Sequence, residues 1–154
     1  MTARLIRWIR RFRGPGDALD FARVGFALLA LQVALKAVGL RRVLAYLDPT
    51  SPAWLSDPAA RHVALRDGRR IAGYADAWLR RLRPRNPCLR RSLLLFGRLR
   101  RAGLPVTFCM GIREGQALVA DDLIRGHAWL EFDGRVLLES EATAARNLRT
   151  FSYP

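Results

Sequence analysis

The residue types that support nucleophilic catalysis are scarce in this chain. It contains two cysteines, Cys88 and Cys109, and two histidines, His62 and His127. A cysteine thiolate can attack an amide carbonyl, an imidazole can shuttle the proton, and a carboxylate can fix the imidazole tautomer. The question is therefore which elements of the fold could bring one cysteine, one histidine and one acid together.

Cys88 lies at the start of a predicted helix. After it, "LRRSLLLFGRLRR" carries apolar residues at helical spacing, and Gly103 followed by Pro105 ends the pattern. A helix N-terminus presents unpaired N–H groups and the positive end of the helix dipole, which both favour a thiolate. Three neighbouring arginines act in the same direction: Arg85, Arg90 and Arg91. A small buried hydrophobe is the alternative reading, and position alone does not decide between them.

The histidine and the acid come from a predicted hairpin. "GHAWLEFDGRVLLES" (126–140) predicts two short strands around Asp-Gly, with His127 starting the first and Glu139 ending the second. Glu131 and Asp133 are rival acids. Cys109 falls in the middle of the alternating strand "VTFCMGIR", so we interpret it as a packing residue. We expect His62, in an arginine-rich segment, to lie on the surface.

The register of this hairpin decides whether Glu139 can reach His127. A two-residue turn at 133–134 would place Glu139 opposite Ala128, on the other face of the sheet. A three-residue loop over 132–134 with a bulge at Gly134 would pair His127 directly with Glu139. The turn chemistry of the bulged loop is good, and its register would place Glu131 opposite Arg135 and aliphatic side chains opposite one another. We therefore predict the bulged loop, a positive φ at Gly134 and a hydrogen bond between His127 and Glu139.

Composition indicates a single globular domain with a strong positive charge. The chain has 154 residues, of which 51% are hydrophobic, and 27 Lys and Arg against 13 Asp and Glu give a net charge of +14. Such a charge favours anionic partners. Two cysteines make no disulfide framework, and no signal peptide is visible, so we expect a reducing cytoplasm. Neither C-x-x-C spacing nor another ligand pattern supports a metal site, and we expect no cofactor.

The first half of the sequence reads as helical and the second half as mixed. A helix is predicted from Asp17, as its N-cap, to Val38, and its uncharged stretch is too short for a bilayer span, which favours a core helix. The basic segment 1–13 predicts an amphipathic helix, either packed on the domain or in peripheral contact with a membrane. After a proline-rich linker (48–58) another helix follows. We expect an α+β fold with a helical region 1–83 and a core 84–154.

The chain also resembles a known family. "CLRRSLLLFGRLRRAGLPVTFCMGIREG" followed by "GHAWLEFDGRVLLE" is similar to the transglutaminase-like leader peptidases of lasso-peptide biosynthesis, over about residues 84–139. The resemblance implies a transglutaminase/papain-like core, in which a central cysteine-bearing helix packs on a small antiparallel sheet. It also implies that Cys88 is the nucleophile, His127 the general base and then acid, and Glu139 the orienting acid.

Further roles and partners follow from this reading. The tetrahedral oxyanion needs donors, and the Cys88 backbone N–H is the natural first one, with Asn86 as a candidate second donor or a simple turn residue. Trp129 shares a strand face with His127 and either shields the imidazole or belongs to the core. The resemblance implies a precursor (leader) peptide as substrate, a separate leader-recognition protein, and the lasso cyclase as a candidate partner.

Two other classes of function remain open at this point. The same triad would support a transglutaminase-like acyltransferase or an amidase, because the attack by the thiolate is common to all three. A non-enzymatic basic domain is the third reading. The sequence lacks a recognition motif or aromatic-interleaved basic strands, so we expect no nucleic-acid partner.

Overall fold

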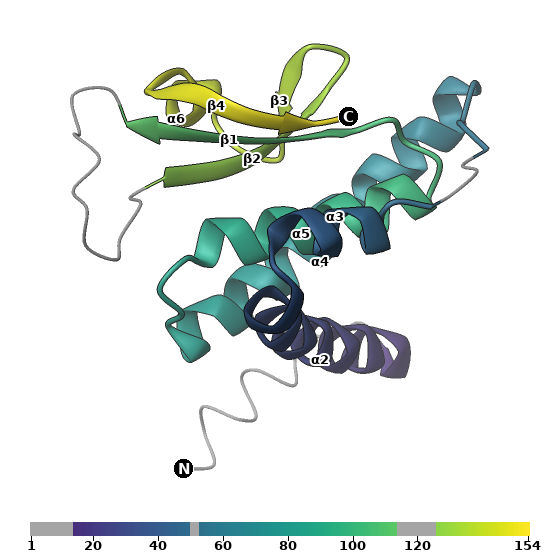
Figure 1. Ribbon diagram of the computed structural model, residues 1–154. Helices are drawn as coiled ribbons and strands as arrows, with labels where there is room; N and C mark the ends of the chain where they lie inside the picture. Colours follow the sequence, from purple (N-terminus) through teal and green to yellow (C-terminus); the bar gives the residue numbers. More distant parts are fainter. Residues whose placement is uncertain (1–13, 50–52, 114–125) are drawn as a thin grey trace.

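The computed structural model describes residues 14–49, 53–113 and 126–154, which form a layer of helices beneath an antiparallel sheet (Figure 1). The helices are α2 (Pro15–Val38), α3 (Leu40–Leu47), α4 (Pro58–Leu82), α5 (Pro87–Arg101) and the short α6 (Glu141–Ala145). The strands are β1 (Thr107–Arg113), β2 (Gly126–Phe132), β3 (Arg135–Leu137) and β4 (Asn147–Tyr153), in the order β3-β2-β1-β4. The predicted α+β fold is confirmed. The predicted basic helix over 1–13 lies outside the described residues.

Helix α2 is apolar on nearly every side. It begins with proline at its first position, and Gly39, with a φ of 79°, follows its end. Asp17 lies inside its first turn and is not the N-cap that the sequence suggested. Among the described helices, its segment Gly16–Val38 has the length and hydropathy of a membrane span. One face is nevertheless core, because Val24, Leu28 and Leu31 are buried.

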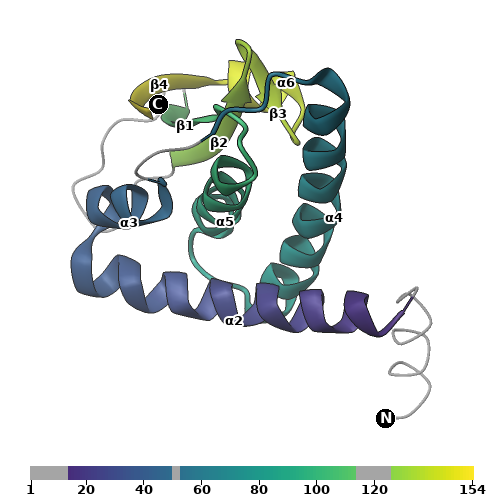
Figure 2. The ribbon, with the colours of Figure 1, turned by 90° about the vertical axis from the view of Figure 1, so that its right-hand side faces the viewer.

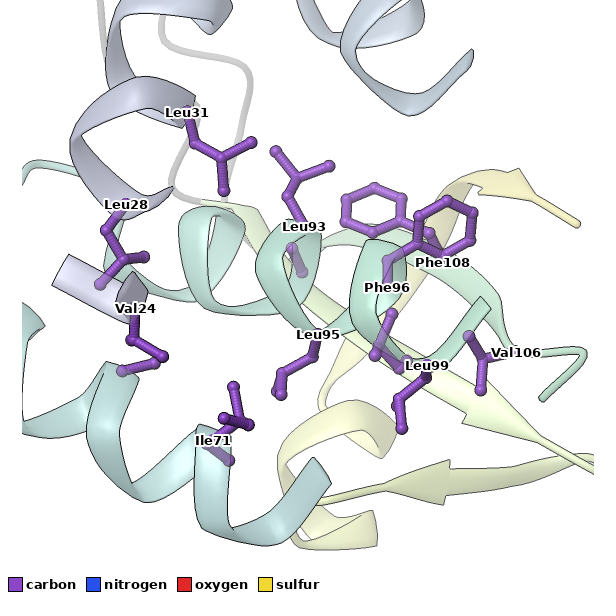
Figure 3. Close-up of a cluster of buried hydrophobic side chains, with 14 of the residues drawn as sticks. Val24, Leu28, Leu31, Ile71, Leu93, Leu95, Phe96, Leu99, Val106 and Phe108 are labelled. Atoms are coloured by element: carbon purple, nitrogen blue, oxygen red, sulfur yellow. The ribbon is translucent and has the colours of Figure 1, made fainter. Parts of the chain in front are cut away.

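Helix α5 is the centre of the molecule. Seen along its axis, it is surrounded by α2, α3, α4 and the sheet (Figure 2). Its buried side chains Leu93, Leu95, Phe96 and Leu99 meet residues of α2 and α4 on one side and β1 on the other (Figure 3). This arrangement explains why its apolar residues are not confined to one stripe.

The ends of α4 and α5 are fixed by local signals. The Asp57 carboxylate accepts hydrogen bonds from the backbone N–H groups of Ala59 and Ala60, both at 3.1 Å, and so caps α4. After α5, Gly103 has a φ of 81°, and the N–H of Leu104 donates to the carbonyl of Leu99 at 3.0 Å. The left-handed glycine predicted at the end of the cysteine-bearing helix is therefore confirmed.

One hydrophobic core joins the two regions that the sequence suggested. Residue 83 falls in the short connection between α4 and α5. Val24 of α2 and Ile71 of α4 belong to the same buried cluster as Phe108 of β1 and Leu130 of β2. The helices before residue 83 thus form one side of the core on which the sheet packs.

The hairpin turn corrects the predicted register. Phe132 pairs with Arg135, so the turn has two residues, and both Asp133 (φ 49°) and Gly134 (φ 74°) have positive φ. The positive φ at Gly134 is confirmed, but the three-residue bulged loop is wrong. Asp-Gly with two left-handed residues is the turn whose twist matches the flanking strands, and this local preference determines the register.

Candidate active site

Cys88 is the second residue of α5 and follows Pro87, which suits the first helical position because its missing N–H is not needed there. The thiol is half-buried and points toward the start of β2, with Sγ 3.9 Å from the Gly126 carbonyl oxygen. Backbone N–H groups of Leu89 and Ala128 hydrogen-bond to the sulfur. The helix start and the strand start therefore surround the thiol with donors that stabilise a thiolate.

A buried serine fixes α5 against β2. The Ser92 hydroxyl donates to the carbonyl oxygen of Ala128 at 2.9 Å, and Ser92 is 1% exposed. Ser92 lies one helical turn after Cys88, and Ala128 is the residue after His127. This single bond thus fixes the helix turn that carries the thiol relative to the strand residue that carries the imidazole.

His127 lies between the thiol and an acid. Its Nε2 is 2.6 Å from the Glu139 carboxylate, and the two side chains are 20% and 14% exposed. The imidazole also hydrogen-bonds to the Cys88 side chain. Because Nε2 faces Glu139, Nδ1 is the nitrogen left to exchange a proton with the thiol.

The electrostatics of the pair favour a thiolate and an imidazolium. The hydrogen bonds that the imidazole makes with Cys88 and then with Glu139 raise the pKa of His127 to about 9, against the opposing effect of burial. Burial raises the pKa of Cys88, but the His127 hydrogen bond and the backbone N–H groups outweigh it, so the net pKa is below that of an ordinary thiol. An activated cysteine needs this combination.

Glu139 reaches His127 because the chain leaves the sheet just before it. Continuing the two-residue turn as a regular ladder would put Glu139 on the wrong face, but β3 ends at Leu137. Leu138 then has a φ of 61°, a conformation that costs a non-glycine residue about 1–2 kcal/mol. The predicted contact is present, although it is formed by a different backbone path from the one expected.

Arg91 holds this irregular segment in place. From α5, its Nη2 donates to the Leu138 carbonyl at 3.0 Å and its Nη1 to the Glu139 carboxylate at 3.2 Å. Its Nε donates to Asp76 of α4 at 2.8 Å, and the side chain is 14% exposed. One guanidinium therefore connects the Glu139 carboxylate, the Leu138 carbonyl and helix α4.

The two rival acids lie away from the imidazole. Glu131 accepts a hydrogen bond from the Trp129 indole at 2.9 Å and forms an ion pair with Arg149. Asp133 is exposed at the tip of the hairpin. Of the three acids that the sequence offered, Glu139 is the one in contact with His127.

Trp129 is both core and neighbour of the imidazole. It is 2% exposed, and its ring lies nearly parallel to the His127 ring, with centroids 6.1 Å apart and an angle of 12° between the planes. Gly111 of β1 makes room for it, since a Cβ there would lie 3.0 Å from Cη2 of the indole and would clash with the Leu148 carbonyl. The absence of a side chain at Gly111 thus allows the indole to lie beside the histidine.

The remaining sequence candidates also have clear positions. Asn86 is exposed at the N-cap of α5 and its side chain makes no capping hydrogen bond. Cys109 is fully buried beside Trp129, and burial, followed by the negative charge of Glu131, raises its pKa to about 11. His62 is exposed on α4. Within the described ranges, no group of three or more His, Cys, Asp or Glu side chains could hold a metal ion.

A cysteine at a helix start, a histidine on the adjacent strand and an acid bound to that histidine are the three side chains that a Cys–His–acid mechanism requires. The chain belongs to the transglutaminase-like superfamily, whose family description it matches over residues 26–151. That match extends from α2 through β4, so it includes the N-terminal helices as well as the triad-bearing elements. No curated protein and no solved structure shows a significant match to the chain.

Membership in this superfamily indicates cysteine-dependent peptidase or acyltransferase chemistry. Sequence reasoning found Cys88, His127 and Glu139, but it missed the roles of Arg91, Asp76 and Ser92. A signal was available for Ser92, which is a lone hydroxyl on an otherwise apolar face of α5. Arg91 and Asp76 had no such signal, since arginines are abundant throughout the chain.

Proposed function

We propose that this protein is a cysteine peptidase that removes the leader from a ribosomally made lasso-peptide precursor. The observation that carries the proposal is the hydrogen-bonded series from Cys88 through His127 to Glu139, with the imidazole Nε2 2.6 Å from the carboxylate. The resemblance of residues 84–139 to the leader peptidases of lasso-peptide biosynthesis supports the substrate class.

The acylation step begins with the Cys88 thiolate. Its sulfur bonds to the scissile carbonyl carbon, and the carbonyl π electrons move to oxygen to give a tetrahedral oxyanion. The Cys88 backbone N–H, in the first turn of α5 where N–H groups lack helical partners, donates to that oxygen, with Asn86 as the second donor. His127 then gives its proton to the leaving amine as the C–N bond breaks, which leaves a thioester.

Deacylation uses the same residues in the reverse sense. Water attacks the thioester carbonyl while neutral His127 accepts its proton, and the C–S bond breaks to release a carboxylate and regenerate the Cys88 thiolate. Glu139 stabilises the imidazolium through both steps. Trp129, buried beside the imidazole, shields it from bulk water.

Transamidation is the competing function, and membership in the superfamily fits it as well as it fits peptidase activity. The thioester is common to both reactions, and the acceptor that attacks it decides between hydrolysis and acyl transfer to an amine. Amidase activity on another substrate uses the same intermediate. An exclusively non-enzymatic basic domain would not account for a thiol with a lowered pKa beside a histidine with a raised one.

The partners in this proposal are separate proteins. A leader-recognition protein binds the leader and delivers the precursor to the thiol, and a cyclase consumes the released core peptide in the cytoplasm. The net charge of +14 favours association with an acidic leader or an acidic recognition protein.

The test is reconstitution with a precursor peptide and a recognition protein encoded beside this gene. Mass spectrometry should detect two fragments whose masses together equal the precursor plus one water. Addition of methylamine distinguishes the alternatives, because a transamidase would yield a methylamide in place of the carboxylate. An intact precursor after prolonged incubation with all partners would refute the peptidase proposal.

The partner requirement is tested separately in the same assay. Cleavage at limiting precursor should be faster with the recognition protein, and the acceleration should decline as salt is raised, because exposed charges are screened. Equal rates with and without the recognition protein would contradict the delivery role while leaving the peptidase activity in place.

A further inference from the structure

A groove with a volume of about 740 Å³ lies between α2, α3 and α5. Its floor is apolar and is made of recessed side chains from all four large helices: Val24, Leu31, Val43, Ile71 and Leu94. Figure 2 shows α2 running beneath α3 and α5, the helices that supply most of the lining residues. The volume and the apolar floor of the groove are typical of a binding site, and the volume is larger than that of an ordinary packing defect.

Beside the groove lies an apolar stripe of α2 that the other described residues leave exposed. Leu19, Phe26, Leu29 and Val33 follow helical spacing on one face and are 51%, 76%, 49% and 67% exposed. From Leu19 to Val33 the stripe is about 21 Å long at 1.5 Å per residue. A surface of this length suits a macromolecular partner better than a small ligand.

Arginines surround the groove. Arg23, Arg42, Arg98 and Arg101 line its rim, and the one acid in the lining, Asp20, pairs with Arg70 at 3.0 Å. Arg98 pairs with Asp67, and Arg23 lies 3.6 Å from Asp20. Arg42 and Arg101 are exposed and have no ion pair with another described residue. The rim therefore carries excess positive charge.

The positive charge of the rim distinguishes between the kinds of partner that fit the groove. A second copy would bring two arginine-lined rims of a +14 chain together, and the segment 1–13, with five arginines, has the same sign. An anionic membrane matches the charge but is too flat to reach a floor where Val24 and Ile71 are only 5% and 4% exposed. A convex acidic element satisfies both the charge and the shape.

We propose that this groove docks an amphipathic helix of a partner protein, with apolar side chains in the groove and flanking Asp and Glu on the arginine rim. The half-buried Ala27 and Ala34 let the backbone of such a helix approach α2 closely. The exposed stripe from Leu19 to Val33 is then covered by the body of the same partner.

The docking site is separate from the triad. No residue that lines the groove is a triad residue, and along the axis of α5 the groove residues Leu94 and Arg101 lie about 9 Å and about 20 Å from Cys88. Binding at the groove therefore does not require the proposed peptidase activity, and each can fail without the other.

The probe for this site is a fluorescein-labelled amphipathic peptide of leucine and glutamate with leucines at i, i+3, i+4 and i+7, and a leucine–lysine peptide of the same pattern is its control. Fluorescence anisotropy should show that the full-length protein binds the glutamate peptide and not the lysine peptide. Arg42→Glu/Arg101→Glu should weaken this binding by about tenfold or more. Arg69→Glu/Arg80→Glu, two exposed arginines of α4, makes the same charge change away from the groove and should leave it unchanged.

Four outcomes would overturn the proposal. Equal affinity for the two peptides, or equal loss in both double variants, would show that binding is nonspecific. Binding to vesicles of phosphatidylglycerol and phosphatidylcholine that Arg42→Glu/Arg101→Glu abolishes, without peptide binding, would assign the surface to a membrane. Dimerisation blocked by Ala30→Trp would assign it to a second copy. In every case the rate at which iodoacetamide alkylates Cys88 shows separately whether the thiol is activated by the triad.

Discussion

Replacing Arg91 with methionine should slow turnover without unfolding the protein. Arg91 is the residue that holds both the Glu139 carboxylate and the carbonyl of left-handed Leu138, and Asp76 fixes its own position. Methionine keeps the aliphatic part of the side chain and removes every donor. Glu139 should then lose the constraint that keeps it 2.6 Å from the imidazole.

The magnitude follows from the bond that is lost. A hydrogen bond to a charged group contributes about 1.5–3 kcal/mol, and the pair is 14% exposed on each side, so solvent screens it only in part. If that loss falls on the transition state, kcat/KM should drop by about 10- to 100-fold. Removing the acid itself sets the upper limit, about 10²–10⁴-fold for Glu139→Gln.

A double-mutant cycle separates positioning from general destabilisation. If Arg91 acts through Glu139, Arg91→Met should cost little in a Glu139→Gln background. Arg69→Met is the control, because Arg69 is exposed on the neighbouring helix α4 and lies outside both the triad and the groove. It should leave precursor cleavage unchanged. An Arg91→Met effect of equal size in both backgrounds would refute the positioning role.

Three further predictions concern pH, α5 and the sheet. Activity needs a Cys88 thiolate and a protonated His127, so it should fall above pH about 9 as the imidazolium titrates. Glu139→Gln removes a cause of the raised pKa and should move that alkaline limb to lower pH; an unmoved limb would contradict the contact. Ser92→Ala should lower the free energy of unfolding by about 1–2 kcal/mol in urea titrations, and an unchanged midpoint would argue against its buried bond. Gly111→Ala should displace the neighbouring indole and alter its near-ultraviolet circular dichroism, with slower turnover, whereas a native spectrum and rate would contradict the packing argument.

The position of Cys88 at the start of a helix was predictable because its signals are local. Proline before Cys88, apolar spacing through the helix and Gly103 at its end all lie within one segment of sequence. The packing role of Cys109 followed from its position in the middle of a predicted strand, and the strand face that His127 shares with Trp129 followed from alternation. Signals of this kind depend on neighbouring residues in the sequence and not on contacts with distant parts of the chain.

The path to Glu139 was not predictable, because it depends on two competing effects. The type of turn is local, and Asp-Gly adopted two left-handed residues where cross-strand matching had suggested a bulge. The change of path after β3 that brings Glu139 to His127 depends on tertiary contacts. Local preference does not explain it, because leucine disfavours the positive φ seen at Leu138. Contacts with Arg91 on a distant helix offset that cost, and no pattern around residue 138 indicates them.

The elements missed by the sequence reading also depend on tertiary contacts. The strand β4 pairs with β1 across many intervening residues, and its register shifts between Met110 and Gly111, which breaks simple alternation. The short helix α3 begins at Leu40, two residues after the predicted end of the preceding helix at Val38, and no helix was predicted there from the sequence. Short elements of this kind are stabilised by packing more than by propensity.

The most direct test of the triad is the competition between the two cysteines for iodoacetamide in the native protein, followed by mass spectrometry across pH. Cys88 should alkylate first and with a pKa below that of an ordinary thiol, because His127 and backbone N–H groups stabilise its thiolate. Cys109, fully buried and with a pKa raised to about 11, should react slowly. Precursor cleavage should accordingly survive Cys109→Ala and be abolished by Cys88→Ala. Faster alkylation of Cys109 than of Cys88 would contradict the assignment of the nucleophile.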